Sequence, residues 1–146
     1  MCVIPLTLTP NSLIEYRECR LAEQQVSFVS QHIPLIQEHF LTKEDQIKAL
    51  RIIYCESRGK INAVGKNKDG TYDKGLWQFN DNTWAWLKGK LKFTGDRFDP
   101  LLSTKVARWL IYNDGWKHWN SSKKCWYNEN KNRSFYGYKS RTSFSQ

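Results

Sequence analysis

Two acidic residues are spaced so that they could work as a pair. Glu56 ends a stretch with apolar residues at helical spacing, and Asp73 follows a glycine-bearing turn further along the chain. A carboxyl group on the apolar side of a helix holds its proton more tightly, because removal from water disfavours the charged form. A carboxylate in a wet, hydrogen-bonded turn stays ionised. One neutral and one charged carboxyl group suit the cleavage of a glycosidic bond.

Each acid also has a simpler interpretation. A glutamate at a helix end is often exposed, and an aspartate after a turn often accepts hydrogen bonds from its own backbone. However, Ile52 and Ile53 precede Glu56 by four and three residues, so Glu56 continues an apolar stripe. If the turn folds back over the helix end, Asp73 faces Glu56 across a cleft. We therefore predict Glu56 as the general acid and Asp73 as the second carboxylate.

Aromatic and amide side chains lie close behind the two acids. Sugars stack their apolar C–H faces on indole rings, while their hydroxyls need amide partners. We therefore predict a set of sugar-contacting residues: Gln78, Asn80, Trp84, Trp77, Trp116 and Trp119. In the alternative interpretation, Leu76 and one of Trp77 or Phe79 belong to the core. Trp116 and Trp119 then either form an apolar wall beside Glu56 or only fill the core.

The elements that must position these residues are mainly helical. Thr42, followed three residues later by Asp45, resembles a capping box with aspartate in place of the usual glutamate. The apolar spacing after it predicts a helix over residues 43–57. Before it, the pattern predicts a helix starting at residue 11 or 12 and a short apolar piece over residues 33–40.

Turn-forming residues crowd between residues 59 and 80 and predict a small antiparallel sheet. The Asp69-Gly70 pair is a hairpin-turn signal. A shorter helix then begins at residue 81 or 82, and Asp99-Pro100 predicts the start of another helix, which ends before Gly115. The expected fold class is α+β: a mainly helical fold with a small antiparallel sheet and an active-site cleft.

Length and charge limit the possible organisation and partners. The 146 residues fit one domain, residues 1–146. Within it we expect an N-terminal helical support over residues 1–42, a catalytic core over residues 43–119 and a basic aromatic segment over residues 120–146. The formal charge of +9 favours polyanionic partners, whether nucleic acid, anionic lipid or the acidic polymers of a bacterial wall.

The remaining sequence signals are mostly negative. Four cysteines allow three pairings, and free buried thiols are an equally good interpretation. The three histidines show no ligand spacing with the cysteines, so we expect no metal and no cofactor. No apolar run approaches the roughly 18 residues of a membrane span. The first ten residues lack a basic region, so we expect no transmembrane segment and no classical signal peptide.

The residues around the two acids resemble a known superfamily. Glu56-Ser57, the run Asp-Gly-Thr-Tyr-Asp-Lys-Gly-Leu-Trp-Gln-Phe-Asn over residues 69–80, and then Trp84 resemble the active-site stretch of chicken-type lysozymes. They are also similar to the Glu-Ser and Gly-Leu-x-Gln signature of soluble lytic transglycosylases and phage wall-degrading enzymes. The strong match covers residues 55–84, and a weaker one extends to residue 119.

The resemblance implies a lysozyme-like fold and a peptidoglycan-degrading muramidase. Such an enzyme cleaves the β-1,4 bond between N-acetylmuramic acid and N-acetylglucosamine, with Glu56 as acid, Asp73 as second carboxylate, and Gln78, Asn80 and Trp84 along the sugar subsites. Lytic transglycosylases manage with the glutamate alone and release 1,6-anhydromuramic products, so Asp73 favours hydrolysis. A non-catalytic glycan-binding or nucleic-acid-binding protein is the remaining alternative.

The expected partners follow from that activity. They are peptidoglycan glycan strands and the anionic bacterial envelope, and because no recognised nucleic-acid motif accompanies the basic segment, we expect no specific nucleic acid. An enzyme of this kind is bacteriolytic or antimicrobial. Its location stays open, with virion-associated, phage-encoded and signal-independent export as the routes to the cell wall.

Overall fold

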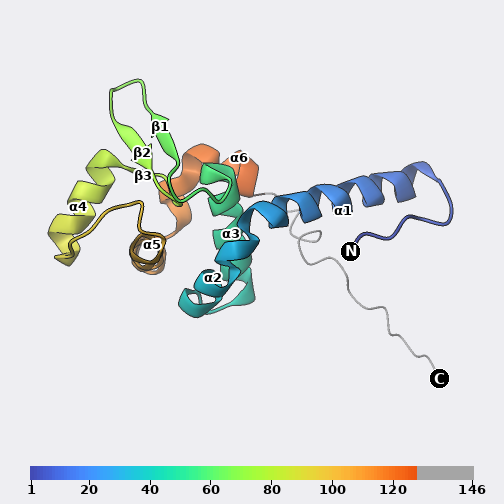
Figure 1. Cartoon of the computed structure of the whole chain (residues 1–146), viewed down its shortest axis with the longest axis horizontal. Coiled ribbons are helices and arrows are strands. Elements are labelled where there is room, and N and C mark those ends of the chain that lie inside the picture. The colour runs from blue at the N-terminus through green and yellow to red at the C-terminus, as the bar shows by residue number, and fades with distance from the viewer. Residues whose placement is uncertain (128–146) are drawn as a thin grey trace. The chain divides into compact units, whose positions relative to one another are not determined.

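The computed structural model describes residues 1–127. These residues form two compact units, residues 1–27 and residues 28–127, and each is described by itself. Helix α1 (Pro10–Val29) begins in the first unit and ends in the second (Figure 1). The predicted division at residues 42 and 119 stays a prediction, and most of the basic aromatic segment over 120–146 lies outside the described residues.

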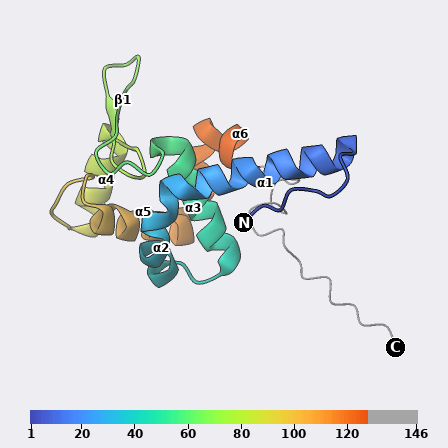
Figure 2. The same cartoon turned by 45° about the vertical axis from the view of Figure 1, so that its right-hand side comes forward.

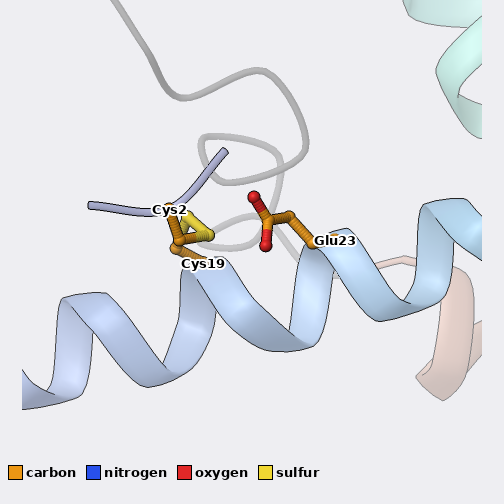
Figure 3. Close-up of side chains that lie close together, drawn as sticks. All are labelled: Cys2, Cys19 and Glu23. Atoms are coloured by element: carbon orange, nitrogen blue, oxygen red, sulfur yellow. A yellow bond between two sulfur atoms is a disulfide. The ribbon is translucent and has the colours of Figure 1, made fainter. Parts of the chain in front are cut away.

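The first unit is held by a helix cap and a disulfide. The Ser12 amide donates to Thr9 Oγ1 at 3.2 Å, and the Thr9 amide donates to Ser12 Oγ at 3.0 Å, so the first turn of α1 is capped reciprocally. Cys2 pairs with Cys19 (Figure 3), and a second disulfide joins Cys55 to Cys125 in the other unit. The four cysteines are therefore paired, and the alternative of free buried thiols is wrong.

Two short helices follow α1 in the second unit. The 3-10 helix η1 (Ser30–His32) and helix α2 (Ile33–His39) carry the chain back, which confirms the short piece predicted over residues 33–40. His32 Nε2 lies 2.7 Å from the carbonyl oxygen of Gly59. A Cβ on Gly59 would lie 2.1 Å from the carbonyl oxygen of Phe28, and the φ of Gly59 is 76°. Only glycine fits this close approach.

Helix α3 (Lys43–Ser57) has the bounds that the sequence predicts. The Thr42 hydroxyl accepts a hydrogen bond from the Asp45 amide at 3.1 Å, as its capping pattern indicates. The helix ends at Arg58, whose φ of 55° is left-handed and stops the helical run. Glu56 therefore lies in the last turn of α3.

A three-stranded antiparallel sheet follows, in the order β1 (Val64–Lys66), β2 (Tyr72–Lys74) and β3 (Phe79–Asn80). The turn between β1 and β2 contains the Asp69-Gly70 pair. The Asp69 carboxylate accepts from the Thr71 amide at 3.0 Å, and Gly70 has a φ of 85°. The predicted small sheet and its hairpin signal are confirmed.

Two capped helices complete the frame. Asn80 caps α4 (Asp81–Leu91), and Asp99 caps α5 (Pro100–Asp114) with its carboxylate on two backbone amides. Both starts agree with the sequence prediction, as does the end of α5 before Gly115. The 3-10 helix η2 (Trp116–Ser122) and the short helix α6 (Lys123–Trp126) close the described chain.

Helix α3 is the centre of the second unit. It packs against α2 and α6, and α2 packs against α5. The sheet lies beside α4, away from α2, in both views (Figures 1 and 2). The core is formed by fully buried apolar side chains: Ile36, Ile52, Ile53, Leu76, Trp77, Leu87 and Leu110.

The observed architecture is α+β, mainly helical with one small antiparallel sheet, as predicted. Among residues 1–127, no helix is long and apolar enough to cross a membrane.

Candidate active site

Glu56 is fixed at the end of α3 by its two neighbours. The hydroxyl of buried Ser57 lies 3.1 Å from the carbonyl oxygen of Ile53 and 2.8 Å from that of Leu76, so it ties the last helical turn to the segment before β3. Cys55 is bonded to Cys125 of α6. The backbone around Glu56 is therefore held to two other elements.

The carboxyl group of Glu56 is mostly removed from water. Burial raises the pKa of Glu56 above its ordinary value. A hydrogen bond from the Ser122 hydroxyl to Glu56 Oε1 opposes this rise, and the negative charge of Asp73 adds to it. The net result is a glutamate that stays protonated to a higher pH than an exposed one.

Asp73 lies in a polar environment on the sheet. It pairs with Gly65 of β1 and with Asn80 of β3 in the strand register. Its Oδ1 accepts hydrogen bonds from Asn67 Nδ2 and Asn80 Nδ2, each at 3.0 Å. Asp73 is thus fixed in place by amide donors from β3 and from the residue that follows β1.

The sheet itself is anchored by Arg97, which is buried. One guanidinium nitrogen donates to the carbonyl oxygens of Tyr72 and Phe79 at 3.2 and 2.8 Å, and the other forms an ion pair with Asp81 at 2.6 Å. Gly75, with a φ of 83°, lies so close to this segment that a Cβ would come within 2.2 Å of the Arg97 carbonyl oxygen. Strands β2 and β3 are therefore clamped from one side.

Glu56 and Asp73 line the same pocket, which has a volume of about 510 Å³. Its walls combine carboxylates, amides, hydroxyls, one lysine, one histidine and two aromatic rings. The lining residues are Glu56, Asn67, Lys68, Asp69, Asp73, Gln78, Phe79, Asn80, Thr83, His118, Trp119 and Ser121. This mixture can hydrogen-bond sugar hydroxyls while an indole offers an apolar face.

Five of the eight predicted site residues lie in this pocket, and three do not. Glu56, Asp73, Gln78, Asn80 and Trp119 line it. Trp77 is fully buried and donates its indole N–H to Thr104 Oγ1 at 3.0 Å, whereas Trp84 is buried against Phe79 and Phe93. Trp116 packs on the core beside Phe40.

Trp77 and Trp84 are thus core residues, which corrects their prediction as sugar contacts, whereas Trp116 is partly buried against the core and does not line this pocket. Residues 75–78 form a turn instead of a strand, so both Leu76 and Trp77 point inward, and Phe79 is buried as well. The alternative interpretation placed only one of Trp77 and Phe79 in the core, whereas both side chains are buried there. Trp119 is buried and also forms part of the pocket wall, and its role as a sugar contact stays a prediction.

Gln78 has a mainly architectural contact pattern. Its φ of 51° is left-handed, and its Nε2 donates to the carbonyl oxygens of Ala63 and Gly75 at 3.1 and 2.8 Å. It therefore fixes the turn between β2 and β3 to the segment before β1 while also lining the pocket.

Several residues that line the pocket or bind one of its carboxyl groups were not predicted from the sequence. Asn67 was missed although it binds the second carboxylate, and Ser122 was missed although it binds the first. His118 is hydrogen-bonded to Asp114 at 2.6 Å, as expected for a polar surface histidine, but it also lines the pocket. The clustering of asparagines near Asp73 was a usable signal for Asn67, whereas no local pattern pointed to Ser122.

One group of side chains has the types that bind metals. Cys2, Cys19 and Glu23 lie close together on and beside α1 (Figure 3). The two sulfurs are joined in a disulfide, so they are not thiolate ligands, and Glu23 pairs with Arg20 at 3.1 Å. These contacts account for the group without an ion.

Comparison with known families gives one match. A family model described as the transglycosylase SLT domain matches residues 38–134. The match covers more than half of the chain and includes every residue that lines the pocket. Among curated proteins, no match is found.

Proposed function

The chain belongs to the transglycosylase SLT domain family, lysozyme-like enzymes that cleave glycosyl bonds of peptidoglycan, and within this family we propose that it is a muramidase. Its reaction is hydrolysis of the β-1,4 bond between N-acetylmuramic acid and N-acetylglucosamine. The observation that carries this proposal is the pairing of Glu56 and Asp73 in one pocket with opposite surroundings.

Glu56 supplies the proton in the first step. Since burial raises its pKa, the carboxyl group keeps its proton to a higher pH than an exposed glutamate does. Glu56 transfers this proton to the glycosidic oxygen as the bond from that oxygen to the anomeric carbon breaks. The bonding electrons go to the oxygen, and positive charge develops on the sugar ring.

Asp73 acts on that charge. Its carboxylate, held by Asn67 and Asn80, either stabilises the oxocarbenium-like state or bonds to the anomeric carbon. Glu56, now ionised, then takes a proton from the water that attacks the anomeric carbon. Where Asp73 has bonded to that carbon, the bond breaks and its electrons return to the Asp73 carboxylate. The sugar gains a hydroxyl, and Glu56 regains its proton for the next turnover.

Part of the pocket wall binds the glycan in this proposal. Trp119 offers an indole edge or face to the sugar, and Asn80 and Gln78, whose side-chain amides also bind within the protein, line the same pocket. Lys68 adds a positive charge to this wall. The net positive charge of the whole chain favours approach to an anionic envelope.

A lytic transglycosylase is the second candidate, and the matching family favours it by its description. In that reaction Glu56 ionises as before, but it then removes a proton from the 6-hydroxyl of the muramic sugar itself. The oxygen closes on the anomeric carbon and gives a 1,6-anhydro ring. Asp73 would then have no required role.

Product analysis separates the two reactions. Purified peptidoglycan is digested with the wild-type protein, and the soluble muropeptides are measured by mass spectrometry. Hydrolysis adds one water and leaves reducing muramic ends, which is the expected result. Anhydromuramic ends, lighter by one water, would replace the muramidase assignment by the transglycosylase. Binding to the wall without either product would refute both.

A further inference from the structure

Ser122, the last residue of η2, lies between two hydrogen-bond acceptors. Its Oγ is within hydrogen-bond distance of Glu56 Oε1, and it lies 3.1 Å from the carbonyl oxygen of Trp119. A serine hydroxyl carries one hydrogen and can accept further bonds through its lone pairs. Ser122 can therefore donate to only one of the two oxygens at any moment.

The Trp119 carbonyl does not depend on Ser122. The indole N–H of Trp126 also donates to it, at 2.9 Å. This carbonyl group is buried with both tryptophan rings, and it keeps one donor whichever way the Ser122 hydroxyl turns. Turning the hydroxyl toward Glu56 therefore leaves no buried acceptor unpaired, which keeps the cost of the rotation small.

Ser122 occupies a helix N-cap position, but its side chain does not cap the helix. It is the N-cap residue of α6, where a serine side chain normally accepts a hydrogen bond from a backbone amide of the first turn. In this structure Ser122 makes no such cap bond. Its hydroxyl is directed instead to Glu56, 66 residues away in the sequence.

The support of Ser122 is rigid. Trp119 and Trp126 are buried, and the Trp119 indole donates to the carbonyl oxygen of Trp77 at 3.0 Å. The disulfide between Cys55 and Cys125 joins the residue before Glu56 to α6, three residues after Ser122. The distance between the Ser122 hydroxyl and the Glu56 carboxyl group is thus fixed from both sides.

We propose that Ser122 is a positioning residue whose hydroxyl moves its hydrogen from the Trp119 carbonyl oxygen to Glu56 when Glu56 becomes ionised. This inference rests on the proposed function of Glu56. While Glu56 is neutral, the hydroxyl can remain on Trp119. When Glu56 gives its proton to the glycosidic oxygen, the Ser122 O–H turns and donates to the new carboxylate. The hydroxyl returns when Glu56 takes the proton of water.

Other charged or titratable groups also face this pocket. They are Asp73 from β2, Lys68 and Asp69 from the turn after β1, and His118 from η2, which is paired with Asp114. Each can affect the pH dependence of the reaction. The test must therefore change Ser122 while all of these groups stay in place.

Three variants isolate the hydroxyl of Ser122. Ser122→Ala removes it, Ser122→Thr keeps a hydroxyl on a similar stem, and Ser121→Ala removes the neighbouring hydroxyl, which makes no hydrogen bond to Glu56 among the described residues. The kcat/KM for peptidoglycan fragments is measured across pH. Ser122→Ala is expected to lower kcat/KM about tenfold or more, since a hydrogen bond to a charged group is lost.

The pH profile distinguishes positioning from a general structural effect. Without its donor the ionised form of Glu56 is less stable, so the alkaline limb of kcat/KM moves to higher pH in Ser122→Ala. Ser122→Thr is expected to restore the wild-type limb, and Ser121→Ala to leave the limb unmoved. The proposal would be overturned if the alkaline limb of kcat/KM stayed at the wild-type pH in Ser122→Ala. It would also be overturned if Ser121→Ala moved this limb to higher pH by the same amount.

A carbon-13 NMR titration of Glu56 in the wild type and in Ser122→Ala provides a readout without turnover. The midpoint is expected to rise in the variant, and an unchanged midpoint contradicts the hydroxyl switch. If Glu56→Gln keeps full activity, the proposed function fails instead, whatever the titration of the Ser122 variant shows. The two failures are therefore distinguishable.

Discussion

The pocket has a carboxyl group on its helical side and another on its sheet side, and the two groups have different surroundings. On the helical side, Glu56 is mostly buried, follows a disulfide-bonded cysteine and accepts a hydrogen bond from Ser122. On the sheet side, Asp73 has two amide donors on one oxygen. The comparison teaches that one pocket gives its two carboxyl groups different surroundings: burial raises the pKa of Glu56, whereas two amide donors hold the carboxylate of Asp73 in place.

The two sides also differ in how they are built. The helical side is fixed by long-range bonds, namely the Cys55–Cys125 disulfide and the Ser57 bridge to Leu76. The sheet side depends on close backbone approach, with Gly75 against the Arg97 segment. A substitution on the helical side should therefore affect Glu56 more than Asp73, and one on the sheet side should affect Asp73 more than Glu56. Such substitutions test the comparison.

The largest effect is expected on the helical side. Glu56→Gln keeps the size of the side chain and an acceptor for Ser122 but removes the proton donor. We expect kcat to fall about 10²–10⁴-fold with an unchanged fold, measured by release of soluble muropeptides and by circular dichroism. A folded Glu56→Gln protein with wild-type activity would remove Glu56 from the mechanism.

The matching change on the sheet side is Asp73→Asn. It keeps the shape and removes the charge that the muramidase mechanism needs, so we expect a loss of about 10²-fold or more in kcat. Retention of most activity would indicate the transglycosylase reaction. The variant thus sharpens the comparison by showing whether the sheet side takes part in chemistry or only in binding.

Two glycines test the construction of the sheet side. Gly75 and Gly70 have nearly the same φ, 83° and 85°, but only Gly75 has a backbone atom within 3 Å of an added Cβ. Gly70→Ala should cost only the backbone strain, about 1 kcal/mol in the free energy of unfolding. Gly75→Ala should cost more and should also lower activity. Equal losses in thermal or urea unfolding would show that the close approach is unimportant.

The smallest effect concerns stability and pH. The pKa of Glu56 is raised on folding, so the folded state binds more protons, and stability falls as pH rises through the folded pKa. Because glutamine does not titrate, Glu56→Gln removes this fall in stability with rising pH. We expect the variant to have a Tm a few degrees above wild type at neutral pH, with the gain disappearing at low pH. A pH-independent difference would contradict the burial effect.

The sequence was most informative where structure is local. Thr42 and Asp99 predicted their helix starts because a cap depends on a few neighbouring residues, and Asp69-Gly70 predicted its turn for the same reason. The two carboxyl groups were found because Glu56 continues an apolar stripe and Asp73 follows a turn.

Contacts between distant segments were not predictable in the same way. Ser122 reaches Glu56 across 66 residues, and the pairing of Cys55 with Cys125 spans 70. No spacing rule covers such separations. The burial of Trp77 was missed because residues 75–78 form a turn, where neighbouring side chains do not alternate between two faces.

The central claim is that burial raises the pKa of Glu56. A site-resolved carbon-13 NMR titration of the glutamate side chains in the wild-type protein, assigned with Glu56→Gln, tests it most directly. The structure predicts a Glu56 midpoint clearly above the ordinary value for glutamate. A midpoint at or below that value would contradict the claim and remove Glu56 as the proton donor.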